Sequence, residues 1–104
     1  MAKSSERLWT ILVVDDEAVI RHLLCQKLKS EGYTCLEAGS SEQAMEKMNE
    51  RPADLVTLDI IMPGGSGVEF LPELKKNYPD TIVIMATAVG DAETAIKCVR
   101  MGAD

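Results

Sequence analysis

Residues 11–16 have the sequence ILVVDD, an apolar run of four residues that ends at two acids, Asp15 and Asp16. The pattern returns in LVTLD, which ends at Asp59, and in IVIMAT, which ends at Thr87. Apolar runs of this length predict strands buried on both faces, as in a parallel sheet. In an open α/β sheet, ligands bind beyond the carboxyl ends of such strands. If these strands are neighbours, three carboxylates and a hydroxyl meet in one crevice, which suits a hard cation and a phosphoryl group.

The segments between the apolar runs have the apolar spacing of helices. The predicted strands are Trp9–Val14, Thr34–Glu37, Asp54–Leu58 and Thr81–Ala86. The predicted helices are Glu17–Glu31, a second from Ser40 or Ser41 to about Glu50, Val68–Lys76, and a fourth that Asp91 can cap. The residues expected to face inward are Ile20, Leu23, Leu24 and Leu28, then Ala44, Met45 and Met48, then Phe70, Leu71 and Leu74, and finally Ala95, Ile96 and Val99. This βαβαβαβα order predicts right-handed parallel crossovers in a doubly wound α/β sheet.

Glycine and proline residues mark where the predicted helices end or become irregular. Gly32 is the expected end of the first helix. The sequence MPGGSG at residues 62–67 is too rich in glycine and proline for regular structure and predicts a loop. Pro72 falls inside the third predicted helix, so we expect either a kink or a later start.

Size and composition narrow the function classes. A length of 104 residues supports one domain, with residues 1–7 expected to be frayed. A net charge of −6 argues against nucleic acid as a direct partner, because a phosphate backbone attracts clusters of Lys and Arg. No apolar run is long enough to span a membrane and no secretory signal is evident, so we expect a cytoplasmic protein without membrane contact.

The three cysteines, Cys25, Cys35 and Cys98, are odd in number and widely spaced. This spacing fits neither a zinc site nor a disulfide framework. We therefore expect buried, reduced thiols, as is usual in a cytosolic protein.

Each candidate site residue also has a purely structural interpretation. Acids such as Asp15 and Asp16 at the start of a helix often serve only as an N-cap and a partner of the helix dipole. Asp59 alone fits the common case of a strand that ends in Asp before a loop, and Thr87 alone fits a turn residue or a hydroxyl that flanks a helix. Their combination at successive strand ends is harder to explain by chance. In the strand order 2-1-3-4 the first and third strands are neighbours, and the three acids then meet.

The chain resembles the receiver domain of bacterial two-component response regulators. The matching stretches are ILVVDDE at residues 11–17, DLVTLDIIMP at 54–63, Gly67, IVIMATA at 82–88 and GAD at 102–104. The resemblance covers residues 1–104 as one receiver domain with a flavodoxin-like fold. It implies a phosphoprotein of signal transduction, a switch and not a turnover enzyme, that receives a phosphoryl group from a histidine kinase or phosphotransfer protein and controls an output domain.

The resemblance also implies the roles of the site residues. Asp59 is the phosphoacceptor, and the Thr87 hydroxyl and the Ala88 amide contact the phosphoryl group. Asp16 binds Mg²⁺ or Mn²⁺ directly and Asp15 binds it through water. Asp59 and the backbone carbonyl of Ile61 complete the protein ligands.

One departure from the family pattern concerns the carboxyl end of the chain. A receiver has a fifth strand ending in a lysine, then a fifth helix, and the sequence stops at Asp104 before either. Lys97, within the fourth predicted helix, cannot replace that lysine. We therefore expect a truncated receiver whose bare fourth strand, Thr81–Ala86, favours a homodimer or aggregation.

Two other functions stay open. A hydrolase with an aspartyl nucleophile on a similar sheet usually carries a second acid two residues later, where this chain has Ile61. A non-phosphorylated interaction module is favoured by the missing lysine.

Overall fold

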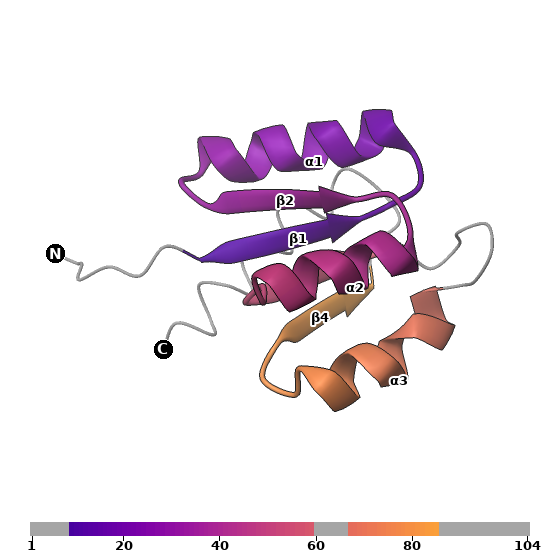
Figure 1. Cartoon of the computed structure of the whole chain (residues 1–104). Helices are drawn as coiled ribbons and strands as arrows, with labels where there is room; N and C mark the ends of the chain where they lie inside the picture. Colours follow the sequence, from indigo (N-terminus) through magenta and orange to yellow (C-terminus); the bar gives the residue numbers. More distant parts are fainter. Residues whose placement is uncertain (1–8, 60–66, 86–104) are drawn as a thin grey trace, which may run out of the picture.

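The computed structural model describes residues 9–59 and 67–85, which form a parallel sheet with helices on both faces (Figure 1). The elements are β1 (Thr10–Val14), α1 (Ala18–Ser30), β2 (Thr34–Ala38), α2 (Ser41–Glu50), β3 (Leu55–Leu58), α3 (Gly67–Asn77) and β4 (Ile82–Met85). All three strand pairs are parallel, and the order is β2-β1-β3-β4. The predicted doubly wound sheet and its strand order are confirmed.

The two inner strands are buried on both faces, which explains why their sequences are continuously apolar. Ile11, Val13 and Leu55 pack in one cluster with residues of α1. The alternate residues of the same strands, Leu12 and Val56 among them, pack in a second cluster with residues of α2 and α3. Figure 1 shows α1 on one side of the sheet and α2 with α3 on the other. The helices on both faces keep solvent away from the strands, so the accessible part of each strand is its end.

The helix α1 ends at Ser30, close to Gly32, the residue predicted to end it. Gly32 adopts a φ of 95°, in the left-handed region that favours glycine after a helix. Leu24 and Leu28 are buried and Ile20 is partly buried, as expected. The prediction for Leu23 is wrong, because its side chain is 45% exposed. The buried stripe contains Leu24, Cys25 and Leu28, and Leu23 lies about 100° from Leu24 on the side away from Cys25.

The start of α2 settles which serine is the cap. Ser40 is the N-cap, and its hydroxyl accepts a hydrogen bond of 3.2 Å from the Gln43 amide. Ala44 and Met48 are fully buried and Met45 is partly buried, as the helical spacing predicts. The cap and the apolar stripe together fix the position of α2 on the sheet.

The helix α3 runs from Gly67 to Asn77 with Pro72 inside it. Of the two alternatives predicted from Pro72, the later start is therefore wrong, and the kink stays a prediction. Phe70 and Leu74 are buried and Leu71 is partly buried against the same cluster as α2. Pro72 is exposed. No helix in the described part of the chain has both the length and the apolar character needed to cross a membrane.

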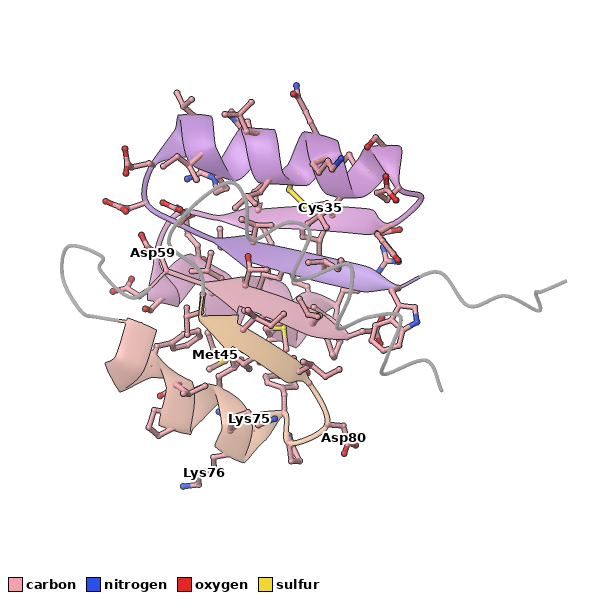
Figure 2. The ribbon with its side chains drawn as sticks, turned by 180° about the vertical axis from the view of Figure 1, so that it is seen from behind. Cys35, Met45, Asp59, Lys75, Lys76 and Asp80 are labelled. Carbon is pink, nitrogen blue, oxygen red and sulfur yellow. A yellow bond between two sulfur atoms is a disulfide. The ribbon has the colours of Figure 1, made fainter. Side chains whose placement is uncertain are left out.

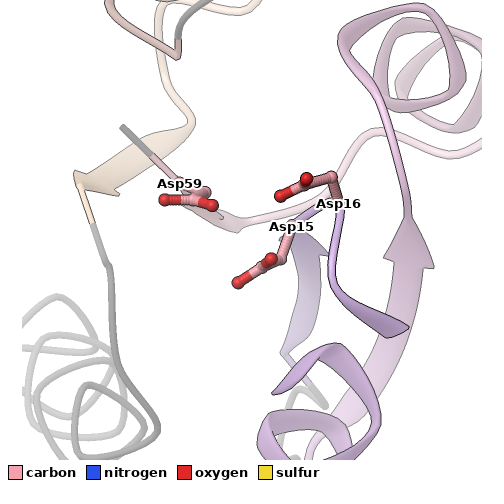
Figure 3. Close-up of side chains that lie close together, drawn as sticks. All are labelled: Asp15, Asp16 and Asp59. Atoms are coloured by element: carbon pink, nitrogen blue, oxygen red, sulfur yellow. The ribbon is translucent and has the colours of Figure 1, made fainter. Parts of the chain in front are cut away.

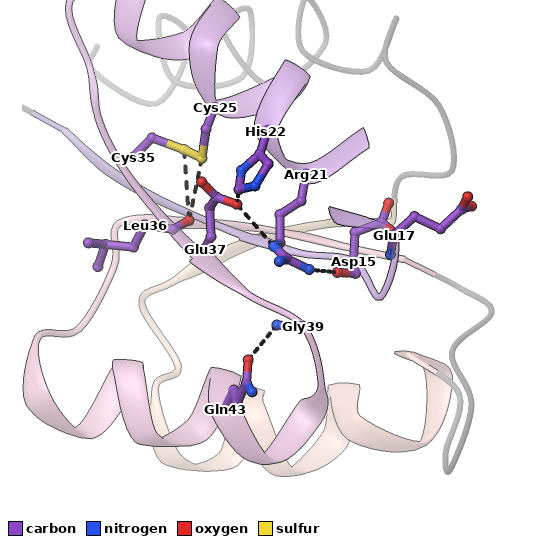
Figure 4. Close-up of polar contacts among 10 residues, drawn as sticks. All are labelled: Asp15, Glu17, Arg21, His22, Cys25, Cys35, Leu36, Glu37, Gly39 and Gln43. Atoms are coloured by element: carbon purple, nitrogen blue, oxygen red, sulfur yellow. Dashed lines mark hydrogen bonds and ion pairs between the residues drawn. A yellow bond between two sulfur atoms is a disulfide. The ribbon is translucent and has the colours of Figure 1, made fainter. Parts of the chain in front are cut away.

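The cysteine prediction is half right. Cys25 of α1 and Cys35 of β2 are buried, 2% and 8% exposed, but they form a disulfide instead of remaining reduced (Figure 4). Because α1 packs against β2, their Cα atoms come within 5.6 Å, inside the range that a disulfide spans. A spacing of ten residues along the chain gives no indication of this contact. Cys98 lies outside the described residues.

Several predicted boundaries shift by one residue, and some predictions are not tested. Trp9, Asp54 and Thr81 lie just before their strands, and β2 continues to Ala38. Three predictions fall on residues outside the described part of the chain: fraying at 1–7, the loop at 62–66 and the fourth helix. The predicted loop is wrong at Gly67, which begins α3.

Candidate metal centre

The carboxyl ends of β1 and β3 lie side by side, because the hydrogen bonding continues one residue past each strand. The Asp59 amide donates to the Val14 carbonyl over 3.0 Å, and the Asp15 amide donates to the Ala38 carbonyl of β2 over 3.1 Å. In the register of β1 and β3, Val14 is paired with Leu58. Asp15 and Asp59 therefore follow paired residues and emerge at the same edge of the sheet, as the strand order predicts. Figure 2 shows Asp59 at this edge.

Three carboxylates meet at this edge. Asp15, Asp16 and Asp59 each place one carboxylate oxygen so that all three oxygens lie within 4.8 Å of one another. Figure 3 shows the three side chains directed toward a common space. Asp15 is 3% exposed, whereas Asp59 is half-buried and Asp16 is exposed. A set of hard oxygen donors that is open on one side suits a cation such as Mg²⁺, which keeps several waters.

The surroundings of Asp15 favour neutralisation of the negative charge on its carboxylate. Burial raises the pKa of the Asp15 carboxyl above its ordinary value of 3.8, although a hydrogen bond from the Glu17 amide opposes this. The negative charges of Asp59, Asp16 and Glu17 raise the same pKa further. Like charges this close favour either a proton or a bound cation. The chemistry of the cluster therefore fits a divalent metal.

The capping interpretation of the acid pair is wrong. The N-cap of α1 is Glu17, whose side chain makes no capping hydrogen bond. Asp15 Oδ1 instead accepts from the Glu17 amide over 2.8 Å, which orients the Asp15 side chain ahead of the helix. Asp16 lies between the two in the bend that connects β1 to α1.

A polar network next to the acids was not predicted from the sequence. Arg21 of α1 donates from Nη1 to the Asp15 carbonyl over 2.8 Å and from Nε to Glu37 Oε1 of β2 over 3.0 Å (Figure 4). His22 Nδ1 lies 2.7 Å from the same Glu37 oxygen. The available signal was the spacing, since Arg21 precedes Leu24 by three residues and so lies near the buried face of α1.

The remaining predicted site residues are Ile61, Thr87 and Ala88, and all three lie outside the described residues. Their contacts with a metal or a phosphoryl group stay predictions. The part of the site that the structure brings together is the cluster of Asp15, Asp16 and Asp59.

Comparison with known proteins identifies the family. The family model described as the response regulator receiver domain matches residues 11–104. The phosphate regulon transcriptional regulatory protein PhoB of Pseudomonas aeruginosa is 42% identical over 97 residues, which is 91% of this chain and 42% of PhoB. The chain thus spans less than half the length of this curated relative.

Solved structures agree in fold and in sequence. The response regulator TrrA of Thermotoga maritima, solved in complex with Mg(2+)-BeF, is 45% identical, with a TM-score of 0.73 over 77% of this chain and 70% of TrrA. The chemotaxis protein CheY4 of Vibrio cholerae is 24% identical, with a TM-score of 0.79 over 91% of this chain and 98% of CheY4, and supports the flavodoxin-like fold. The chain belongs to the response regulator receiver domain family.

Proposed function

We propose that this chain is the phosphoacceptor domain of a two-component response regulator and that Asp59 receives the phosphoryl group. The observation that carries the proposal is the convergence of Asp15, Asp16 and Asp59, with one oxygen of each within 4.8 Å of the others. Membership of the receiver family supports the same assignment.

In this proposal the acids hold Mg²⁺ or Mn²⁺. Asp16 would bind the ion directly and Asp15 would bind it through a water, while Asp59 and the Ile61 carbonyl would complete the protein ligands. The bound ion would offset the negative charge of the cluster and of the incoming phosphoryl oxygens. The related TrrA was solved in complex with Mg(2+)-BeF, which supports a metal of this kind here.

The phosphoryl transfer itself uses Asp59 as a nucleophile. One carboxylate oxygen of Asp59 forms a bond to phosphorus while the phosphorus–nitrogen bond of a phosphohistidine breaks. The imidazole takes the electron pair of that bond and a proton from solvent, and leaves as neutral histidine. The Thr87 hydroxyl and the Ala88 amide donate hydrogen bonds to the phosphoryl oxygens. The product is an aspartyl-phosphate at Asp59, and the phosphorylated domain then changes conformation. The chain thus acts as a signalling device and not as a turnover enzyme.

The partners follow from this role. A histidine kinase or a phosphotransfer protein supplies the phosphoryl group, and an output domain or a separate partner reads the switched state. The relative PhoB is named as a transcriptional regulatory protein, and its greater length leaves room for such an output. We assign the domain to the cytoplasm, without direct contact with nucleic acid or membrane.

Phosphorylation tests the proposal directly. Incubation with acetyl phosphate and Mg²⁺ should add one phosphoryl group, detected by intact mass, and Asp59→Asn should abolish the gain. Asp80→Asn is a suitable control, because Asp80 is an exposed acid in the turn before β4. Equal labelling of Asp59→Asn would refute the assignment. A wild-type chain that binds Mg²⁺ but accepts no phosphoryl group would favour the interaction module.

Metal binding is a separate prediction. Asp16→Ala should raise the dissociation constant for Mg²⁺ at least about tenfold, because it removes a direct ligand. Isothermal titration calorimetry measures this without any phosphodonor. Glu46→Ala, which removes an exposed acid of α2, should leave the affinity unchanged. Equal affinity of Asp16→Ala and wild type would count against the site.

A further inference from the structure

Arg21 holds the backbone that carries the two acids directly after β1. Its Nη1 donates to the Asp15 carbonyl over 2.8 Å. That carbonyl belongs to the peptide unit that joins Asp15 to Asp16. Because a peptide unit is planar, fixing its orientation fixes the adjoining backbone dihedrals of both residues. The directions in which both carboxylates leave the chain therefore depend on this hydrogen bond.

The same peptide segment is held at other atoms as well. The Asp15 amide donates to the Ala38 carbonyl over 3.1 Å, and Asp15 Oδ1 accepts from the Glu17 amide over 2.8 Å. Arg21 thus supplies the fixing contact at the carbonyl, the point nearest to Asp16. It is also the contact among these that comes from a long side chain, and a substitution can remove it without altering the backbone.

The guanidinium is itself held in place. Its Nε donates to Glu37 Oε1 over 3.0 Å, and the Arg21 side chain is only 18% exposed. Gly39, at the end of β2, leaves the space next to it, since a Cβ at this position would lie 3.2 Å from Arg21 Nη1. A guanidinium can direct two donors at two acceptors in a fixed geometry, whereas a lysine ammonium cannot reproduce that fork. Figure 4 shows Arg21 between Glu37 and Asp15.

We propose that Arg21 is a positioning residue for the metal centre, which orients Asp15 and Asp16 for the cation while binding neither the cation nor the phosphoryl group. This inference rests on the proposed function and extends it to a residue behind the site.

The sign of the effect separates positioning from charge. A positive charge near a cation site repels the cation, so loss of the Arg21 charge alone should tighten Mg²⁺ binding. Loss of a positioning contact should weaken it, and outer contacts of metal ligands typically contribute about 10- to 100-fold to affinity. The two explanations therefore predict opposite results for the same substitution.

The experiment compares Arg21→Met, Arg21→Lys and Gly39→Ala in the full chain by calorimetry with Mg²⁺. Arg21→Met should raise the dissociation constant about tenfold. Arg21→Lys keeps the charge but not the fork and should also bind more weakly than wild type. Gly39→Ala changes no charge and crowds Nη1, so it should weaken binding by a smaller factor. Lys27→Met, at an exposed position of α1, controls for the loss of one positive charge and should leave the affinity near that of wild type.

A second measurement separates positioning from a general loss of structure. With acetyl phosphate, Arg21→Met should need more Mg²⁺ for half-maximal phosphorylation, while its rate at saturating Mg²⁺ stays close to that of wild type. Unchanged or tighter Mg²⁺ binding by Arg21→Met would overturn the positioning role alone, and so would an equal loss in Lys27→Met. A wild-type chain that takes up no Mg²⁺ would overturn the proposed metal centre, and the positioning role with it.

Discussion

At the scale of single residues, the arrangement of acids in the candidate metal centre lowers the stability of the metal-free fold. Asp15 is almost completely buried and lies beside two other acids. Its surroundings raise the pKa of its carboxyl, first through burial and then through the charges of Asp59, Asp16 and Glu17. A folded chain without metal therefore holds a carboxylate in an unfavourable place. Such residues are typical of sites selected for binding at the expense of stability.

This conflict predicts that Asp15→Asn stabilises the metal-free domain. Because the folded pKa of Asp15 is raised above the unfolded value of 3.8, the folded state loses stability as pH rises through that folded pKa. Above that folded pKa the ionised Asp15 thus lowers the free energy of unfolding. The asparagine side chain would be neutral and would keep an oxygen for the Glu17 amide. The melting temperature, measured with a metal chelator, should rise by a few degrees at pH 7.

The pH dependence provides the control. The gain from Asp15→Asn should shrink as pH falls toward 3.8, because Asp15 of the wild type then becomes protonated. Saturating Mg²⁺ should stabilise the wild type more than the variant. Asp80→Asn, an exposed replacement, should show neither effect. A lower melting temperature for Asp15→Asn, or a gain independent of pH, would contradict this account of the site.

At the scale of helices and strands, sequence reasoning succeeded where burial has a clear period. The strands β1 and β3 are buried on both faces, so their apolar runs marked them to within a residue. The adjacency of β1 and β3 followed from the strand order and brought the acids together. The exposure of Leu23 and the disulfide were not predicted, because both depend on the rotation of α1 about its axis and on its position against β2. The contacts of Arg21 were not predicted, because its partners are far apart in the sequence: Asp15 directly follows β1 and Glu37 lies in β2.

The disulfide between α1 and β2 predicts a redox-dependent stability. Cys25 and Cys35 close a short loop, and such a link typically contributes about 2–4 kcal/mol. In a domain of this size, reduction should lower the melting temperature by roughly 10 °C. Melting curves with and without a thiol reductant measure the effect. The double variant Cys25→Ala and Cys35→Ala should lose the response to reductant, whereas Cys98→Ser should keep it. Identical curves for the oxidised and reduced wild type would show that the link contributes nothing.

At the scale of the whole molecule, the two outer strands of the described sheet differ in their protection. In the described part of the chain, β2 and β4 each pair with one strand neighbour. The strand β2 carries Glu37, and charged side chains at a sheet edge discourage pairing with another chain. The sequence of β4, IVIM, carries no charge, and Ile82, Val83 and Ile84 are only partly buried. Association of two copies is therefore expected along β4 and not along β2.

The net charge of the chain makes this association dependent on salt. With a formal charge of −6, two copies repel each other at low ionic strength. Added salt shortens the range of this repulsion, to about 10 Å at 0.1 M, and leaves the apolar contact of the strands intact. Light scattering after size exclusion should thus show a dimer, or larger species, whose fraction grows with both protein concentration and salt. A monomer at micromolar concentration in high salt, with a sharp cooperative melt, would show that β4 does not act as an open edge.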